Sequence, residues 1–370
     1  MAEKIKLGII LGGRSGEHEV SLMSSRSVLS VLDRSKYEVT EIGIDHQGIW
    51  WSGEHVLESL EKGSTQDLYR VFLLPEPGDS TLYKRVLEAG REVISPVTRL
   101  DAVFPVLHGT FGEDGTLQGF FEMADIAYVG AGVLGSSLGM DKSVFKDVMR
   151  ANDIPIADWI VCTRRDVEQG IEAIIQKSEA LGPYPFFVKP ANLGSSVGIT
   201  KVKNRSDLYE GLMEAARYDR RILVERGINA REIEVSVLGN EDAQVSTPGE
   251  IVPSDEFYSY NAKYIDGKSG LFIPAPISDE LIARVKELAL RTYKAIDCAG
   301  MARVDFLLDR DTNELYINEV NTIPGFTSIS MYPKLWDASG LPYPALIERL
   351  VDLALDRKQE RNKSKRTFGD

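Results

Sequence analysis

The segment Met301–Ser330 constrains the fold more than any other stretch of the chain, because it predicts two strands joined by a polar turn. The runs MARVDFLLD and ELYINEVN are rich in apolar residues, and turn-forming residues separate them. If Asp305 lies opposite Glu319, then Arg303 falls opposite Asn321. Side chains alternate between the two faces of a strand, so we expect these four polar side chains to share one face of a β-hairpin.

Two interpretations of that face remain open from this segment alone. The oxygens of Asp305, Glu319 and Asn321 are of the kind that hard cations such as Mg2+ bind, and Arg303 could contact a phosphate. A row of salt bridges on a solvated face fits the same four residues. The rest of the chain has to decide between the two.

Length and charge narrow the class of protein. A chain of 370 residues is expected to form two or three domains with a large buried core. The formal net charge of -13 argues against a general nucleic-acid binder, since neutralising phosphates requires clustered Lys and Arg. The one basic cluster, residues 357–366, is expected to be a frayed, solvated end.

The cysteines and the apolar runs exclude further classes. Cys162 and Cys298 are far apart, which excludes a disulfide framework and a cysteine-rich metal site, and both are expected to be buried thiols. No apolar run approaches the roughly 18 residues of a membrane span, and the first run is too short for a signal peptide. We therefore expect a cytoplasmic protein with no membrane or nucleic-acid partner.

The N-terminus predicts a Rossmann-like unit. An apolar strand over residues 4–11, a glycine turn and a helical pattern over about 20–32 follow one another. The turn lacks GxGxxG, and the next acid, Asp45, comes 33 residues after Gly12, which disfavours a dinucleotide site. The turn instead brings Glu17, followed by a histidine and a second glutamate, to the edge where open parallel sheets bind ligands. Acids there suit an ammonium group.

A second loop, HGTFGEDG, follows a buried-type strand over about 101–107. It brings His108 and Glu113 to the same expected sheet edge, which favours a functional role. A histidine exposed on the surface without a function is the alternative. Residues 50–95 contain no pattern from which we predict structure or function.

The character of the chain changes near residues 130–140, where we place a domain boundary. A helix carrying Lys142 follows, and short strands then alternate with helices. Lys189 ends one strand and precedes a glycine- and serine-rich loop, residues 190–198, whose N–H groups and hydroxyls could surround a phosphate. The loop is not a Walker A motif, and a flexible hairpin turn is the alternative.

Two further segments predict contacts between domains. Residues 225–232 are expected to form a linker whose backbone could meet a flat base and whose carboxylate could meet a ribose. Residues 248–274 form a long polar segment with several aromatic side chains around one lysine, which is typical of a lid or of disorder, and we favour a lid. Amphipathic helices are expected over residues 278–297 and 343–355.

These pieces together resemble an ATP-grasp ligase, and specifically the D-alanine–D-alanine ligases of bacterial cell-wall synthesis. The resemblance covers nearly the whole chain. It rests on GGRSGEHEVSL, LHGTFGEDGTLQG, MDKSVFK, FFVKPANLGSSVGI, LVERGINAREIEV, FYSYNAKY, MARVDF and INEVNTIPGFTSIS, in the order of the family.

The resemblance implies an α/β (α+β) protein with a three-domain ATP-grasp fold. A Rossmann-like substrate domain would occupy residues 1–135, and two ATP-grasp subdomains would occupy 136–227 and 228–358. A lid would cover about 249–273, and a polar basic tail would follow over 359–370. ATP would lie between the two subdomains, together with two Mg2+ or Mn2+ ions.

The resemblance also implies which residues bind ATP and its metal ions. Lys142 and Lys189 would bind phosphates, and the loop Gly194–Gly198 would close over them. The other residues implied to bind ATP are Ser195, Ser196, Glu225, Arg226, Ile228, Glu232 and Lys263. Of the residues on the hairpin face, Asp305, Glu319 and Asn321 would hold the metal ions.

Two D-alanine molecules are the implied substrates. Glu17 would bind the ammonium group of the first, with His108 beside it, and Lys263 and Ser330 would hold the carboxylate of the second. The remaining residues with implied catalytic roles are Ser195 and Tyr264, hydrogen-bonded with Glu17, and Arg303 and the Gly325 N–H, which would stabilise an oxyanion.

A free carboxylate is a poor acyl donor, so ATP would first convert it to D-alanyl phosphate, which the amine of the second D-alanine then attacks. Tyr264 favours an amine as the nucleophile, so a ligase that makes D-alanyl-D-lactate is the second hypothesis. A catalytically silent nucleotide-binding protein is the third. Relatives are commonly dimers, so the resemblance implies a homodimer.

Overall fold

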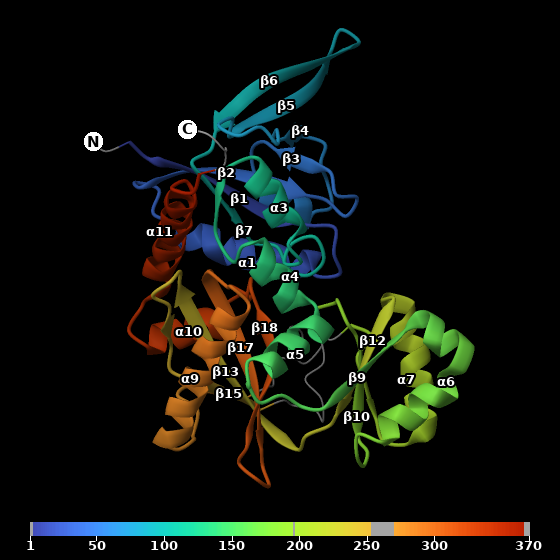
Figure 1. Ribbon diagram of the computed structural model, residues 1–370. Helices are drawn as coiled ribbons and strands as arrows, with labels where there is room; N and C mark the ends of the chain where they lie inside the picture. Colours follow the sequence, from blue (N-terminus) through green and yellow to red (C-terminus); the bar gives the residue numbers. More distant parts are fainter. Residues whose placement is uncertain (1–2, 195–196, 253–269, 366–370) are drawn as a thin grey trace.

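The computed structural model describes residues 3–194, 197–252 and 270–365, which form three β-sheets with helices packed against them (Figure 1). The N-terminal sheet lies at the top of Figure 1, and the two other sheets lie below it. Within these three ranges, no helix is long and apolar enough to cross a membrane. The α/β class predicted from the sequence is confirmed.

An eight-stranded sheet forms the N-terminal domain. Its strands are β1 (Ile5–Gly12), β2 (Tyr37–Ile44), β3 (Trp50–Ser52), β4 (Tyr69–Phe72), β5 (Thr81–Glu88), β6 (Arg91–Arg99), β7 (Ala102–Pro105) and β8 (Ala127–Tyr128). Its helices are α1 (His18–Val31), α2 (Val56–Glu61) and α3 (Thr116–Met123), and α4 (Val133–Met140) follows them. The strand order is β6-β5-β4-β3-β2-β1-β7-β8, and β2, β1, β7 and β8 are parallel, as the Rossmann-like opening predicted.

Alternation along β1 sends apolar side chains to both faces of this sheet. Leu7 and Ile9 pack in one cluster with Val28 of α1, whereas Ile10 packs with Phe121 of α3 in another. Helices therefore cover both faces of the parallel part of the sheet, which leaves its C-terminal edge as the open side where loops carry function.

Residues 50–95, for which the sequence predicted no structure, extend the same sheet by antiparallel strands. The hairpin of β5 and β6 projects from the domain (Figure 1). Leu87 is 72% exposed and Ile94 is 60% exposed on this hairpin. It therefore lacks the alternation between buried apolar and exposed polar residues by which a strand is recognised from sequence.

The central subdomain holds a four-stranded sheet with the order β11-β10-β12-β9. Its elements are α5 (Lys142–Ala151), β9 (Trp159–Thr163), α6 (Arg164–Glu179), β10 (Phe186–Pro190), β11 (Thr200–Val202), α7 (Arg205–Tyr218) and β12 (Arg221–Arg226). Thr163 begins α6 with a capping box, in which its Oγ1 accepts a hydrogen bond from Asp166 N at 3.1 Å and Asp166 Oδ2 accepts from Thr163 N at 2.8 Å. The loop after Lys189 joins β10 to antiparallel β11, so it is a hairpin connection.

The C-terminal subdomain is built on a six-stranded sheet with the path β16-β15-β13-β17-β18, and β14 pairs with β13. Its elements are β13 (Ala230–Gly239), β14 (Gln244–Val245), β15 (Gly249–Val252), β16 (Gly270–Phe272), α9 (Asp279–Ala295), β17 (Gly300–Asp309), β18 (Leu315–Asn321), α10 (Met331–Ala338) and α11 (Tyr343–Arg361). The predicted hairpin register is confirmed, since Asp305 pairs with Glu319 and Arg303 pairs with Asn321.

A bulge, which the sequence did not predict, interrupts this hairpin. The residue after Asp305 pairs with Ile317, which leaves Asn318 as the extra residue on β18. Strict alternation would place Ile317 and Val320 on opposite faces, yet they are 0% and 5% exposed and belong to the same core cluster. The bulge therefore lets Glu319 face away from the core while Ile317 and Val320 both stay packed in it.

Two predicted connections are shorter than expected. The linker predicted over residues 225–232 is mostly strand, because β12 continues to Arg226 and β13 begins at Ala230. The segment predicted as irregular over 248–274 begins and ends as paired strands, β15 and β16. Residues 253–269, which include Lys263 and Tyr264, lie outside the described residues.

The prediction of a solvated basic tail is wrong for the part of it that lies in α11. This helix continues to Arg361 and packs against the N-terminal domain. Arg357 donates a hydrogen bond to Tyr128 O at 3.0 Å, and Arg361 pairs with Asp125 at 2.8 Å. The last helix thus fastens the C-terminal subdomain to the first domain, and its basic residues are used in that contact.

Candidate active site

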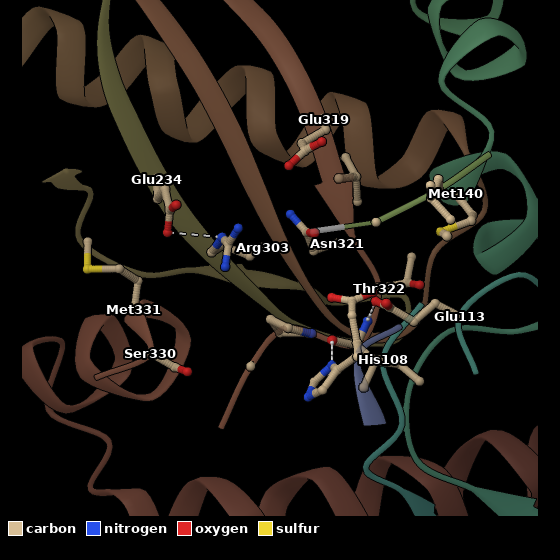
Figure 2. A pocket seen from close by; sticks show the side chains of 18 of the residues that line it. His108, Glu113, Met140, Glu234, Arg303, Glu319, Asn321, Thr322, Ser330 and Met331 are labelled. Atoms are coloured by element: carbon tan, nitrogen blue, oxygen red, sulfur yellow. Dashed lines mark hydrogen bonds and ion pairs between the residues drawn. The ribbon is translucent and has the colours of Figure 1, made fainter. Parts of the chain in front are cut away.

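One cavity is lined by residues of the N-terminal domain, the central subdomain and the C-terminal subdomain (Figure 2). The predicted site residues that line it are Glu17, His108, Lys142, Arg303, Glu319, Asn321, Gly325 and Ser330. Leu193 and Gly194 of the predicted phosphate loop lie on its wall, beside Lys142. The structure therefore brings together residues that are more than 300 positions apart in the chain.

The hairpin face forms the floor of this cavity, and its charges pair closely. Arg303 donates two hydrogen bonds to Asp305, with Nε–Oδ1 and Nη2–Oδ2 distances of 2.7 Å. Asn321 Nδ2 donates to Asp305 Oδ2 at 3.0 Å. Asp305 is only 8% exposed. The row of charges therefore lies along the cavity rather than on an open, solvated face, while the choice between a metal site and a structural row of salt bridges stays a prediction.

Sequence reasoning missed Glu234, which also lies on this floor. Its Oε2 lies 3.0 Å from Arg303 Nε, as the dashed line in Figure 2 marks. Glu234 sits on β13 opposite Asp305, between the buried apolar residues Ile233 and Val235. Burial alone would lower the pKa of Arg303, but Asp305 and Glu234 raise it well above its ordinary value. The alternation of glutamates and apolar residues along this strand was the signal that could have revealed Glu234.

His108, at the start of the second loop, is buried, so its interpretation as a surface residue is wrong. His108 is 5% exposed, and its Nδ1 donates a hydrogen bond to Ile323 O at 3.1 Å while Nε2 accepts one from Ser24 Oγ at 3.0 Å. Burial lowers the pKa of His108. The ring is thus held neutral, with both nitrogens in use, on the wall of the cavity.

Glu113 backs the same loop. It accepts hydrogen bonds from Gly109 N at 2.6 Å and from Ile323 N at 3.2 Å. Burial and the nearby Glu17 carboxylate raise the pKa of Glu113 to about 8. Through these hydrogen bonds the side chain ties the first domain to the segment after β18.

Two glycines let the chain approach Glu17 closely. A Cβ added at Gly109 would lie 2.4 Å from Glu17 Oε2, and one added at Gly194 would lie 2.5 Å from the same oxygen. Gly109 also has a φ of +75°, which favours glycine. The second loop and the phosphate loop thus both touch Glu17, which is 8% exposed.

The two lysines that were predicted to bind phosphate, Lys142 and Lys189, have different surroundings. Lys142 Nζ donates a hydrogen bond to Leu193 O at 2.7 Å, so it holds the stem of the phosphate loop. Lys189 Nζ lies 2.6 Å from Glu225 Oε2, and the other oxygen of Glu225 pairs with Lys146. Burial would raise the pKa of Glu225, but the two lysines lower it to about 2. Sequence reasoning missed Lys146, because a lysine on an amphipathic helix is ordinarily exposed.

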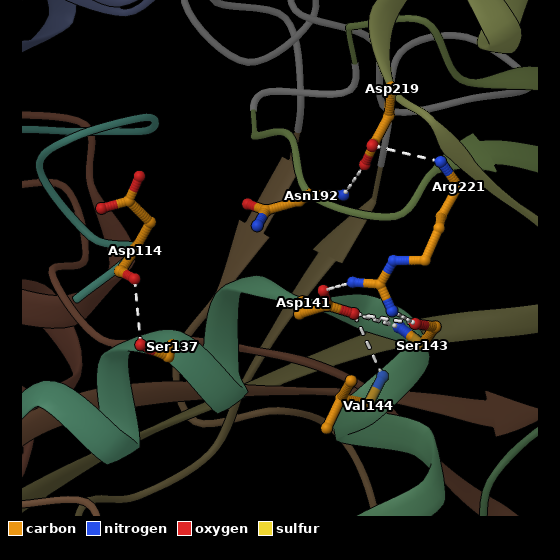
Figure 3. A network of polar contacts seen from close by, with 8 residues as sticks. All are labelled: Asp114, Ser137, Asp141, Ser143, Val144, Asn192, Asp219 and Arg221. Atoms are coloured by element: carbon orange, nitrogen blue, oxygen red, sulfur yellow. Dashed lines mark hydrogen bonds and ion pairs between the residues drawn. The ribbon is translucent and has the colours of Figure 1, made fainter. Parts of the chain in front are cut away.

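A polar network links the start of α5 and Asn192, in the stem of the phosphate loop, to the residues at the start of β12 (Figure 3). Asp141 caps α5 and pairs with Arg221, which also donates a hydrogen bond to Ser143 Oγ at 2.7 Å. Asp219, two residues before Arg221, accepts a hydrogen bond from Asn192 N at 2.8 Å. The start of α5 and the stem of the loop are therefore tied to the same end of β12.

The segment after β18 supplies the last wall. Ser330 Oγ accepts a hydrogen bond from Thr327 N at 3.1 Å and lies 2.8 Å from Thr327 Oγ1. A Cβ at Gly325 would lie 2.7 Å from Ser330 Oγ, so a side chain there would force the serine hydroxyl to shift.

The other predicted site residues lie away from the lining of the cavity. Asp305 lies just behind it through its ion pair with Arg303, whereas Lys189 and Glu225 pair with each other. Arg226 ends β12, Ile228 follows in the short connection, and Glu232 lies on β13. Ser195 and Ser196 lie outside the described residues, as do Lys263 and Tyr264.

Comparison with known proteins agrees with the resemblance of the motifs. Residues 6–131 match the family described as D-ala D-ala ligase N-terminus, and residues 148–352 match D-ala D-ala ligase C-terminus. The D-alanine--D-alanine ligase of Heliobacterium modesticaldum is 50% identical over 365 residues, which cover 98% of this chain and 97% of that protein. The ligase of the same name from Thermoanaerobacter sp. is 52% identical over 362 residues, 97% of this chain and 99% of that one.

The chain belongs to the D-alanine–D-alanine ligase family. Solved structures agree: the D-alanine-D-alanine ligase from Coxiella burnetii has a TM-score of 0.81 and 36% identity, covering 98% of this chain and 97% of that one. The VanG D-Ala:D-Ser ligase from Enterococcus faecalis has a TM-score of 0.82 and 35% identity, and the match covers 95% of this chain and 100% of that one. As a member of this family, the chain has the ATP-grasp fold and is an ATP-dependent ligase, so the predicted fold and enzyme class are confirmed.

Proposed function

We propose that the cavity joins two D-alanine molecules to D-alanyl-D-alanine through D-alanyl phosphate, for the synthesis of peptidoglycan precursors. The observation that carries this proposal is the composition of the cavity: the carboxylate of Glu17, the guanidinium of Arg303 and the Gly325 backbone line one space with the phosphate loop. An acid for an ammonium group, a cation for an oxyanion and a phosphate-binding loop are the groups that acyl activation followed by amine attack requires.

In the first step, ATP transfers its terminal phosphate to the carboxylate of the first D-alanine. Lys142 and Lys189 bind the phosphates, and the loop Gly194–Gly198 closes over them. The ammonium group of the substrate lies against Glu17, beside His108. Because that imidazole is neutral and hydrogen-bonded on both nitrogens, it shapes the pocket and carries no competing positive charge.

The floor of the cavity has the chemistry to hold Mg2+ or Mn2+. The side chains of Asp305, Glu319 and Asn321 share one face of the hairpin, and hard cations prefer carboxylate and amide oxygens. When bound, two such ions would offset the negative charge of the phosphates. Asp305 would exchange part of its contact with Arg303 for a metal ion.

In the second step, the amine of the second D-alanine attacks the acylphosphate carbon and phosphate leaves. Arg303 and the Gly325 N–H stabilise the developing oxyanion, while Ser330 and Lys263 hold the carboxylate of the second substrate. Acylphosphates hydrolyse, so water must be excluded, and Ser195 and Tyr264 with Glu17 are proposed to link the closing loops to the site.

The nucleotide base lies against residues 225–228, and Glu232 meets the ribose. Ser196 would add a hydroxyl to the phosphates. The side chain of Glu225 forms ion pairs with two lysines, so its contribution to base binding comes from its backbone.

A homodimer and a cytoplasmic location remain predictions from the family resemblance.

The experiment is to measure ATP-dependent phosphate release with Mg2+ and D-alanine, D-serine, D-lactate or L-alanine, and to identify each product. We expect D-alanyl-D-alanine, and no release with L-alanine. A preference for D-serine or D-lactate as the second substrate would mean that D-alanine is not the natural acceptor. No phosphate release with any pair would contradict the proposed function.

A further inference from the structure

Outside the cavity, the start of α1 and the turn after β2 bring together three side chains that bind metals. We propose that His18, Glu19 and His46 form a second metal site, one for a transition-metal ion such as Zn2+. A ligating atom of each residue lies within 4.8 Å of those of the other two. None of the three is among the described residues that line the cavity. The site is therefore separate from the proposed Mg2+ site.

The first ligand, His18, is already fixed in position. Its Nδ1 donates a hydrogen bond to Gly13 O at 2.8 Å, so Nε2 carries the lone pair when the ring is neutral. Metal-bound histidines ordinarily use their second nitrogen in this way. Gly12 makes room for the ring, because a Cβ there would lie 3.0 Å from His18 Cε1 and 2.3 Å from Ile44 O.

The second ligand, His46, stands on a rigid turn. The carboxylate of Asp45 accepts hydrogen bonds from Gln47 N and Ile49 N, both at 2.9 Å, and from Trp51 Nε1 at 2.8 Å. These three contacts fix the backbone of the turn. The side chain of His46 is nevertheless 64% exposed, so it can turn without moving the backbone.

Binding requires only movements of exposed side chains. The rings of His18 and His46 stack with their centroids 3.9 Å apart and their planes at 29°, and His46 Nε2 lies 3.8 Å from Glu19 Oε1. A metal ion lies in the plane of each imidazole, at about 2.0–2.1 Å for Zn–N. His46 must therefore rotate out of the stack while its nitrogen and the Glu19 oxygen move closer by about 0.5 Å, to reach tetrahedral spacing.

The ligand set selects the kind of ion. Two imidazoles and one carboxylate suit Zn2+ and its neighbours in the transition series, whereas Mg2+ prefers oxygen ligands. Both cysteines are buried elsewhere in the fold and do not compete for the ion. Three protein ligands leave a fourth position open to water.

The test is isothermal titration calorimetry of the full chain with ZnCl2 in an excess of Mg2+, which occupies oxygen-rich sites. We expect one Zn2+ to bind, with affinity lowered at least about ten-fold in His46→Ala and in Glu19→Gln, since even second-shell partners of a metal contribute that much. Both variants change exposed side chains, so folding is preserved.

His55 supplies a matched control, since it is 80% exposed and lies 3.9 Å from a single glutamate, Glu58. His55→Ala should bind Zn2+ as the unmodified chain does. Titration with Co2+ should give the visible absorption of a tetrahedral site in the unmodified chain and in His55→Ala, and a weaker band in His46→Ala. Absence of Zn2+ binding in excess Mg2+, or equal affinity in His46→Ala and His55→Ala, would overturn the proposal.

Discussion

Arg303 binds Asp305 through two parallel hydrogen bonds of 2.7 Å, although the two residues are only two positions apart on one strand. The pair joins two proposed roles, because Asp305 is proposed to bind a metal ion and Arg303 is proposed to stabilise the oxyanion. In this arrangement the negative charge of the Asp305 carboxylate is offset by the Arg303 guanidinium. We infer that metal binding to Asp305 releases part of the guanidinium toward the reacting carbonyl.

Replacing Arg303 with Met should lower kcat by about 10²–10³, the usual loss for one oxyanion donor. It should also lower the free energy of unfolding by about 3–5 kcal/mol, because the buried carboxylates of Asp305 and Glu234 lose their partner. Steady-state kinetics and urea unfolding measure the two effects.

Arg231→Met is the control, since Arg231 binds Glu250 bidentately at 2.7 and 2.6 Å on the same sheet, outside the cavity. Arg231→Met should lower the free energy of unfolding and leave kcat unchanged. Unchanged turnover in Arg303→Met would remove Arg303 from the mechanism.

Glu319→Gln should raise the Mg2+ concentration needed for half-maximal activity by about ten-fold or more, because an amide is a poor substitute for a carboxylate that ligates a metal. The measurement is a Mg2+ titration at saturating ATP. Glu314→Gln, at the exposed turn before β18, controls for the loss of one negative charge on the same hairpin. A normal titration in Glu319→Gln would mean that the hairpin face is structural only.

Lys146→Met should lower the free energy of unfolding by about 3–5 kcal/mol, because it leaves one oxygen of buried Glu225 without its cation. The double variant Lys146→Met, Glu225→Gln should recover a large part of this loss, since an amide carries no charge to compensate. Urea unfolding of the two single variants and the double variant gives the coupling energy. Simple additivity would show that the two side chains do not act as a pair.

Gly325→Ala should reduce turnover strongly, because its Cβ would lie 2.7 Å from Ser330 Oγ. The added methyl group would push the Gly325 N–H, the proposed oxyanion donor, away from Ser330, which is proposed to hold the second substrate. Gly119→Ala on α3 is the control, since a Cβ there meets nothing within 4 Å. We expect unchanged activity in the control and a raised KM for the second D-alanine in Gly325→Ala. Equal kinetics in the two variants would contradict the close approach.

The sequence predicted the residues of the hairpin floor because strand parity and the turn limit the possible registers. It did not predict the bulge at Asn318, which depends on the packing of Ile317 and Val320 in the core. Lys146 and Glu225 lie 79 positions apart, and no local pattern indicates that they pair. The family resemblance supplied the roles of the loops, since loop geometry has no periodic signal.

Glu113 should make stability depend on pH. Its pKa is raised by burial and by Glu17 to about 8 in the folded chain, against about 4.3 in an unfolded one. Between these values the folded state holds one more proton than the unfolded state, so the contribution of Glu113 to stability falls as pH rises, and the loss is complete above about pH 8. The slope for one such proton is at most about 1.4 kcal/mol per pH unit. Urea unfolding between pH 5.5 and pH 8.5 should therefore show a decline that Glu113→Gln lacks, since an amide does not titrate. Parallel pH profiles for the two proteins would mean that Glu113 is already ionised at neutral pH, held by the Gly109 and Ile323 N–H groups.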